Sequence, residues 1–158
     1  MIDIHLTGVE QFDKVAIISN NRWEWATIAA AAYSLNASLV PMYEAQLPSD
    51  WTYILNDSGS CAVFCATQDI FDQVQQQVLP STPTVKASLC LDAPLGEAHS
   101  FQTAMAASSG DAEGSMIRKP TKEDLANLIY TSVSRLLFRG IVIIMLYLSH
   151  IWYTVCIL

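Results

Sequence analysis

A short apolar run at residues 14–19, Lys-Val-Ala-Ile-Ile-Ser, decides the fold predicted for this chain. Its four consecutive apolar residues, three of them β-branched, are typical of a parallel strand that is buried on both faces. An asparagine pair at residues 20–21 ends the run, and a helix is expected over residues 22–35. The alanines at residues 29–32 would let that helix approach a sheet closely. This order of strand, turn and helix is the first half of a β-α-β unit.

The alternation of strands and helices continues along the chain. Asn36 is expected to end the first helix in the left-handed conformation, and Thr67 to cap the third. Further strands are predicted at residues 38–42, 61–65, 87–91 and 128–132, and further helices at residues 48–58, 68–78 and 101–107. This spacing predicts an α/β fold with an incomplete, doubly wound, mostly parallel sheet and helices on its faces.

Charge is distributed unevenly along the 158 residues. Residues 1–132 carry 6 Lys and Arg against 15 Asp and Glu, a net charge of −9, whereas residues 133–158 carry only Arg135 and Arg139, a net charge of +2. A nucleic-acid-binding surface needs a basic patch, which the acidic first part lacks. No nucleic-acid partner is therefore expected.

The cysteines do not indicate a disulfide-rich secreted protein, since the chain has only four. Cys61 and Cys65 lie four residues apart in a predicted strand and are expected to share one face of it. Buried reduced thiols are favoured over a metal or redox pair, because no His or third Cys lies at ligand spacing. The first residues lack a basic n-region and an apolar h-region, so the expected context is cytosolic.

Other conspicuous side chains have mainly structural interpretations. The tryptophans at positions 23 and 25 are expected to pack against neighbouring loops, and Arg22 to form an ion pair with Glu24 or Asp13 rather than a catalytic pair. His5, His99 and His150 are not accompanied by a nucleophile and carboxylate in a recognisable order, so no catalytic triad is predicted. No catalytic residue and no metal ligand is assigned.

The last 19 residues, Gly140 to Leu158, form an almost wholly apolar run. As a helix this run would extend about 28 Å, close to the ~30 Å core of a bilayer. The basic residues that precede it favour the cytoplasmic side, so membrane association through residues 136–158 is one hypothesis, with the α/β part in the cytoplasm. A β-strand at residues 141–144, or non-native sequence, is the alternative.

Four motifs, in order, resemble the adenylate-forming (AMP-binding) superfamily, and most of all its long-chain acyl-CoA synthetase branch. They lie at residues 15–25 (VAIISNNRWEW), 39–43 (LVPMY), 53–58 (YILNDS) and 124–132 (DLANLIYTS). The resemblance implies that residues 1–132 are a partial AMP-dependent synthetase/ligase domain, a fragment of the large N-terminal domain of an acyl-CoA synthetase. It also implies activation of a fatty acid with ATP and Mg²⁺ to an acyl-adenylate, then transfer to coenzyme A.

The family binds the ATP phosphates with a glycine-rich loop of the pattern T-S-G-T-T-G-x-P-K-G, because glycine lets backbone N–H groups approach the phosphates closely. Thr131 and Ser132 match its first two positions and are the candidate nucleotide-binding residues. After them the pattern is lost. Four positions of the pattern are replaced: Gly by Val133, Thr by Arg135, Gly by Leu136 and Pro by Phe138. The chain is therefore expected to be inactive as written.

Residues 133–158 form a hydrophobic tail after this boundary, and two alternatives account for it. The chain is either a tail-anchored membrane interaction protein without catalysis, or a mis-spliced product of a ligase gene. Val133-Ser134 is what a splice-donor sequence encodes when it is translated in frame, which favours a retained intron. Transcripts that encode the same tail after splicing would exclude that origin.

Overall fold

The computed structural model describes residues 8–107 and 120–130. Four parallel strands form one sheet in the order β2-β1-β3-β4. Their bounds are β1 Lys14–Ile18, β2 Ser38–Met42, β3 Ala62–Cys65 and β4 Ala87–Cys90. Each pair of neighbouring strands is parallel, which confirms the α/β fold with a parallel sheet expected from the strand and helix spacing.

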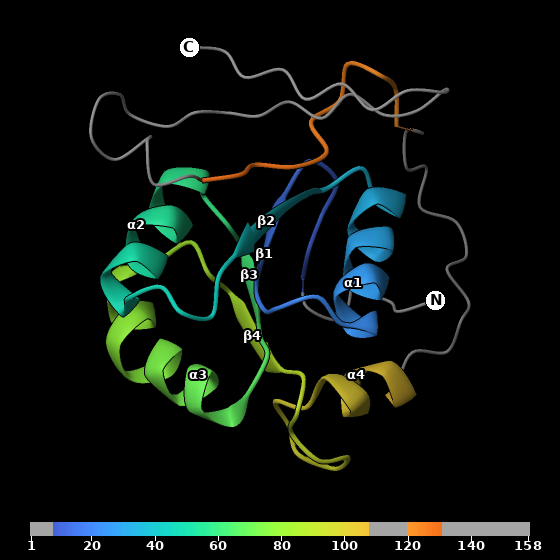
Figure 1. Ribbon diagram of the computed structural model, residues 1–158. Coiled ribbons are helices and arrows are strands. Elements are labelled where there is room, and N and C mark those ends of the chain that lie inside the picture. The colour runs from blue at the N-terminus through green and yellow to red at the C-terminus, as the bar shows by residue number, and fades with distance from the viewer. Residues whose placement is uncertain (1–7, 108–119, 131–158) are drawn as a thin grey trace.

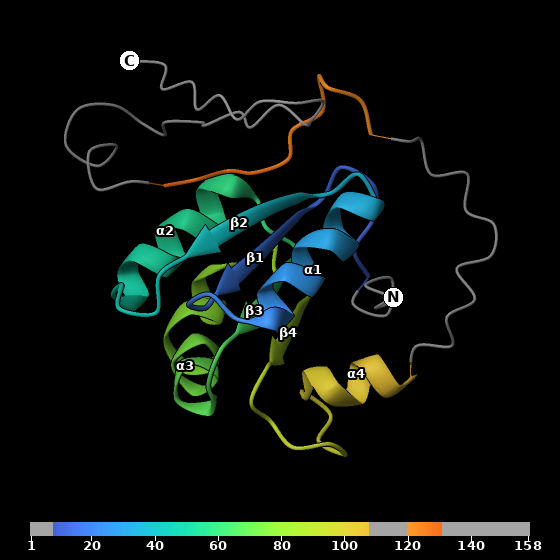
Figure 2. The same cartoon turned by 45° about the vertical axis from the view of Figure 1, so that its right-hand side comes forward.

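Helices cover both faces of the sheet (Figure 1). Helices α1 (Trp23–Ser34) and α4 (Phe101–Ala107) lie on one face, and α2 (Pro48–Ser58) and α3 (Gln68–Gln73) lie on the other (Figures 1 and 2). The predicted helix over residues 68–78 is present but changes its winding, since α3 continues as a π-helical turn at Val74–Val78 and a 3₁₀ turn at Leu79–Ser81.

The strands bury their side chains alternately toward the two helical layers. Val15 and Ile17 of β1 belong to the core beneath α1, whereas Ala16 and Ile18 belong to the core beneath α2 and α3. All four are fully buried. Successive side chains of a strand point to opposite faces of the sheet, and helices cover both faces here. Every residue of the run therefore enters a core, which explains why β1 is continuously apolar.

The helix ends carry capping residues, and two of these, Asn36 and Thr67, match the predicted signals. Asn36 adopts the left-handed conformation, with φ of 56°, directly after α1, and Gly59 does the same after α2 with φ of 66°. The hydroxyl of Thr67 accepts a hydrogen bond from the Ile70 N–H at the start of α3. Pro48 begins α2, where its missing N–H is of no consequence. These caps fix where each helix turns back toward the sheet.

From β1 the chain passes to β2 on one side of β1, and then crosses to β3 on the other side. The order in which strands are added to the sheet therefore reverses between β1 and β3. Among the described residues β4 is the last full strand on one edge, and its Cys90 makes a single parallel bridge to Ser100. At the other edge β2 makes a single parallel bridge, from Leu39 to Asn127, and the described part of the strand predicted at residues 128–132, which is residues 128–130, is not a strand. Residues 120–130 are called the approach segment below.

The tail predictions lie outside the described residues. Neither the candidate membrane span at residues 140–158 nor the alternative strand at residues 141–144 falls within residues 8–107 or 120–130. None of the helices in the described part of the chain has the length and apolar character needed to cross a membrane.

Candidate functional site

The candidate nucleotide-binding residues, Thr131 and Ser132, follow directly after the described part of the approach segment, so the structure does not place them. What the structure does describe is how the segment that leads to them is held. Tyr130 is its last described residue. The candidate site is therefore built from the anchoring of residues 120–130.

Backbone pairing fixes the approach segment against the edge of β2. The N–H of Leu39 donates to the carbonyl oxygen of Ala126 at 2.8 Å, and the N–H of Leu128 donates to the carbonyl oxygen of Leu39 at 2.9 Å. The hydroxyl of Ser38 donates to the Leu125 carbonyl oxygen at 2.8 Å. Because the pairing is parallel, the approach segment runs toward the same edge of the sheet as the carboxyl ends of the strands.

Side chains from both helical layers hold the same segment. The Tyr33 hydroxyl of α1 donates to Asn127 Oδ1 at 2.7 Å. On the opposite face, the Tyr130 hydroxyl donates to Asp57 Oδ2 near the end of α2, also at 2.7 Å. The Tyr53 ring meets the Tyr130 ring edge-on, with 6.3 Å between centroids. Burial, and after it the hydrogen bond to Asp57, raises the pKa of Tyr130 above the ordinary tyrosine range.

The reversal point between β1 and β3 is occupied by a charged cluster. In open α/β sheets the crevice at such a point is the usual ligand site. Here Arg22 spans it, donating to both carboxylate oxygens of Glu24 at 2.6 and 2.7 Å, to Asp92 Oδ1 at 2.9 Å and to the carbonyl oxygen of Ala66 at 3.4 Å. The expected pairing of Arg22 with Glu24 is confirmed. The alternative partner, Asp13, instead accepts from the Glu10 N–H and the Cys61 thiol.

This cluster is built for structure and is not suited to an anion. The Glu24 side chain is 7% exposed, and its hydrogen bonds from Arg22 lower the pKa of its carboxyl although burial opposes that shift. The two carboxylates outnumber the single guanidinium, so the local charge is negative and repels phosphate. This negative charge disfavours a phosphate group at the reversal point.

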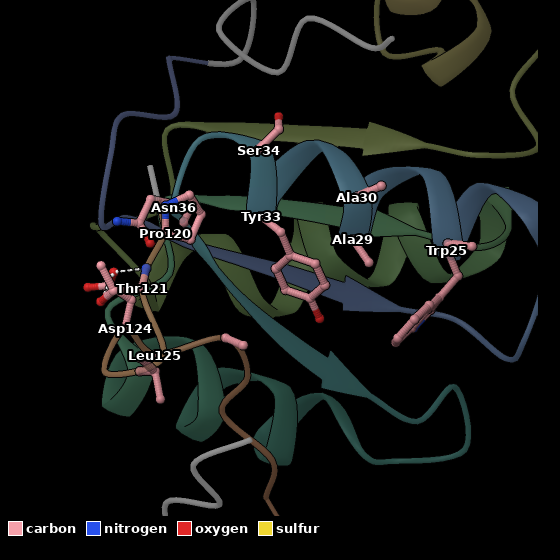
Figure 3. A pocket seen from close by; sticks show the side chains of 13 residues that line it. Trp25, Ala29, Ala30, Tyr33, Ser34, Asn36, Pro120, Thr121, Asp124 and Leu125 are labelled. Carbon is pink, nitrogen blue, oxygen red and sulfur yellow. Dashed lines mark hydrogen bonds between the residues drawn. The ribbon is translucent and has the colours of Figure 1, made fainter. Parts of the chain in front are cut away.

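A cavity of about 680 Å³ opens between the outer side of α1 and the first part of the approach segment (Figure 3). Its walls are mostly apolar and include Trp25, Ala29 and Tyr33 of α1 and Leu125 of the approach segment. Its lining reaches Ala126 but does not extend along the approach segment toward Tyr130.

The predicted arrangement of Cys61 and Cys65 is wrong. Cys61 packs in the core on the α1 side, whereas Cys65 packs in the core on the α2 and α3 side. The strand begins at Ala62, and the carbonyl oxygen of Cys61 accepts from the N–H groups of both Lys86 and Ala87, so the alternation does not extend back to Cys61. Both thiols are free and buried, as expected.

The remaining predicted side chains also have structural positions. The Trp23 ring lies 6.2 Å from the Phe101 ring of α4, between centroids, which agrees with packing against a neighbouring segment. His99 stacks on Phe71 at 4.5 Å and its Nε2 lies 3.1 Å from Gln68 Oε1. Within residues 8–107 and 120–130, no three His, Cys, Asp or Glu side chains gather closely enough to hold a metal ion.

Three residues that hold the approach segment in place were not predicted to do so, although two of them lie within the quoted motifs at 53–58 and 124–132: Tyr33, Asp57 and Asn127. The one available signal was Asn127 itself, a polar residue within an otherwise apolar run before Thr131. Its partner on α1 lies 94 positions earlier in the chain, and the partner of Tyr130 lies 73 positions earlier. Local patterns carry no information about pairs at such separations.

Comparison with known proteins agrees with this arrangement. The sequence model of the AMP-binding enzyme family matches residues 4–134. The long-chain-fatty-acid–CoA ligase FadD15 of Mycobacterium bovis is 30% identical over 126 residues, which cover 79% of this chain and 21% of that protein. The chain thus spans about a fifth of the length of this curated relative.

Solved structures share the fold. A long-chain-fatty-acid–CoA ligase from Archaeoglobus fulgidus superimposes with a TM-score of 0.73 and 20% identity, over 90% of this chain and 26% of that one. The N-terminal domain of FACL13 from Mycobacterium tuberculosis gives a TM-score of 0.72 and 22% identity, over 89% of this chain and 33% of that one. With the family match over most of its length, the chain belongs to the AMP-binding enzyme family.

Proposed function

We propose that this chain corresponds to the first part of a long-chain fatty-acid:CoA ligase, an enzyme that activates a fatty acid with ATP and passes the acyl group to coenzyme A. The family match over residues 4–134 and the 30% identity to a long-chain-fatty-acid–CoA ligase support this assignment. In such a reaction the acid attacks the α-phosphate of ATP and pyrophosphate leaves. The thiol of coenzyme A then displaces AMP from the acyl-adenylate.

The observation that carries the proposal is the anchoring of the approach segment. Two backbone hydrogen bonds to Leu39 and side-chain hydrogen bonds from Tyr33 and Tyr130 hold its strand-like part from both layers of the fold. A loop that must place N–H groups around phosphates needs such a rigid support. In this proposal Thr131 and Ser132 begin the phosphate loop and contact the nucleotide phosphates.

We further propose that the chain as written does not catalyse acyl activation. Val133 and Leu136 stand where the family pattern has glycine, and any side chain at such a position would take the space that a phosphate needs next to the backbone. Phe138 adds further bulk in place of proline. Magnesium would reach such a site with the ATP phosphates, since Mg²⁺ commonly binds through them.

Nucleotide binding to a restored loop tests this proposal. A variant carrying Val133→Gly, Arg135→Thr, Leu136→Gly and Phe138→Pro is compared with the original chain and with a control carrying alanine at the same four positions. Equilibrium binding of a fluorescent ATP analogue in the presence of Mg²⁺ is measured, together with palmitate-dependent ATP–pyrophosphate exchange. We expect saturable binding by the restored variant, no saturable binding by the other two, and no exchange by the original chain.

Each outcome separates a different part of the proposal. Palmitate-dependent exchange by the original chain would refute its inactivity while supporting the ligase assignment. Equal binding by the restored and alanine variants would refute a phosphate loop at residues 131–140. The competing membrane hypothesis makes its own prediction, that the chain floats with anionic liposomes and that a chain truncated after Ser132 does not.

A further inference from the structure

The carboxyl ends of β3 and β4 bring together two thiols that the sequence separates by 25 positions. Cys65 is the register partner of Cys90 across the two parallel strands. Both residues are fully buried in the same core, beneath α2 and α3. They are thus the only adjacent pair of thiols among the described residues, whereas the pair that the sequence spacing suggested, Cys61 and Cys65, faces opposite layers.

The spacing of this pair suits a covalent bond. Neighbouring strands lie about 4.8 Å apart. That separation falls within the Cα–Cα range of roughly 4.4–6.8 Å found in disulfides. Because register partners in a sheet point to the same face, the two sulfur atoms face the same core. We propose that Cys65 and Cys90 are a redox pair that forms an intrachain disulfide on reaction with a hydroperoxide, tying the end of β4 to β3.

The surroundings of the two sulfurs give them different parts in the reaction. Burial raises the pKa of both thiols. At Cys90 the backbone N–H groups of Asp92 and Ala93 oppose that shift by hydrogen bonding to the sulfur, while the nearby carboxylates of Asp92 and Asp72 add to it. A thiolate at Cys90 would raise the pKa of Cys65 further by charge repulsion, so the two sulfurs are close enough to interact electrostatically. In this proposal Cys90 is the thiol that reacts first, because backbone N–H groups stabilise its thiolate and the thiolate is the nucleophile.

The chemistry balances with a hydroperoxide as the oxidant. With hydrogen peroxide, the hydroperoxide used in the test below, Cys90 loses its proton and its sulfur attacks one peroxide oxygen, so that the O–O bond breaks and a sulfenic acid and water form after proton transfer; an organic hydroperoxide would release an alcohol in place of this water. The Cys65 sulfur then attacks the sulfenic sulfur, the S–O bond breaks, and a second water leaves with the thiol proton. Two electrons pass from the two sulfurs to the peroxide.

In this proposal the oxidant enters when the first residues of β4 open locally, since at Cys90 itself the backbone N–H donates to the His99 carbonyl oxygen at 2.8 Å and the strand is bridged to Ser100. β4 is the edge strand, and Ala87, Ser88 and Leu89 are only half-buried. Brief opening at an edge strand of this kind requires less free energy than opening at the fully buried β1. The new bond would lie beside Ala66 and Asp92, which hold Arg22 at the reversal point of the sheet.

Peptide mapping of the oxidised full chain tests the proposal. The reduced chain is treated with hydrogen peroxide under native conditions, blocked with N-ethylmaleimide and digested with trypsin and chymotrypsin. Cleavage after Phe64 separates Cys61 from Cys65, so each linkage has its own mass. We expect the Cys65–Cys90 linkage to be the main product, and a parallel oxidation in urea to give a mixture of linkages.

Matched variants sharpen the test. Cys61→Ser is the control, because Cys61 lies on the same segment but faces Asp13 in the other layer, and it should leave the linkage unchanged. Cys65→Ala and Cys90→Ala should reduce it to the level of the untreated chain. A native product distribution equal to that in urea, or a main linkage through Cys61, would overturn the proposal even if the alanine variants failed to fold.

Discussion

The two edges of the sheet are held in different ways. At the β2 edge, the strand side chains are nearly all buried and the approach segment is hydrogen bonded to backbone, to α1 and to α2. At the β4 edge, three of the four strand residues are half-buried, Gln75 Nε2 donates to the Ser88 hydroxyl at 2.6 Å, and a single parallel bridge from Cys90 to Ser100 covers only the last strand residue. The difference indicates that the β2 edge is rigid enough to support a loop, whereas the β4 edge opens more easily.

Truncating one leucine at each edge should give the largest effect. Leu39 is fully buried in β2, and Leu89 is half-buried in β4. We expect Leu39→Ala to lower the free energy of unfolding by about 3 kcal/mol and Leu89→Ala by about 1 kcal/mol, because the cost grows with the cavity left behind. Urea unfolding followed by circular dichroism measures both, and equal losses would remove the distinction between the edges.

Glu24→Gln should give the next largest effect, because Arg22 joins the start of α1 to the ends of β3 and β4. We expect a loss of about 2 kcal/mol at pH 7, below the value for a fully buried pair because Arg22 is partly exposed and keeps Asp92 as a partner. The cluster holds the end of β4, so the variant should also expose that edge further.

The ion pair of Arg22 with Glu24 predicts that the stability of the fold depends on pH. Since Arg22 lowers the pKa of Glu24, the pair stabilises the fold above the ordinary carboxyl range. That stability is lost as the pH falls below about 4.5 and through the lowered pKa. Urea midpoints measured between neutral and acidic pH should therefore fall more steeply for the original chain than for Glu24→Gln. Parallel pH profiles would contradict the coupling.

Tyr130→Phe tests the anchor at the far end of the approach segment. Removal of the hydroxyl leaves Asp57 without its 2.7 Å donor, and we expect a loss of about 1 kcal/mol in unfolding free energy. Because the pKa of Tyr130 is raised, the original chain should also lose stability as the pH rises above about 10, and the variant less so. Tyr53→Phe, which keeps the ring contact, is the control and should change stability little.

Glu123→Gln should give the smallest effect. The carboxylate of Glu123 lies 3.7 Å from Lys122 Nζ, and both side chains are largely exposed. An exposed pair of this kind contributes about 0–1 kcal/mol, so we expect a change below about 0.5 kcal/mol. A larger loss on urea unfolding would mean that charge, and not backbone pairing, holds the approach segment.

The locally determined parts of this fold were predictable from sequence. The strand at Ser38–Met42 and the helix at Phe101–Ala107 match their predicted bounds, and Asn36, Gly59 and Thr67 end or begin helices as their chemistry requires. These features depend on apolar periodicity and on side chains that bond to the nearby backbone. Such signals lie within a few residues of their effect.

Features that depend on distant parts of the chain were not predictable in the same way. The pairing of Cys65 with Cys90 follows from the register of two strands, and the contact of Arg22 with Asp92 follows from the position of the loop after β4. The strand predicted at residues 128–132 is reduced to one bridge at Asn127 among the described residues. Thr131 and Ser132 lie outside those residues, and their nucleotide role stays a prediction.

Amide hydrogen exchange tests most directly whether the approach segment is an anchored part of the sheet. The N–H groups of Leu39 and Leu128 both donate across the edge of β2. We predict that both exchange slowly, at rates close to those of β1, and that the Ser88 and Leu89 amides at the β4 edge exchange faster. Exchange of Leu128 at the rate of an unstructured peptide, with β1 still protected, would contradict the anchored approach segment.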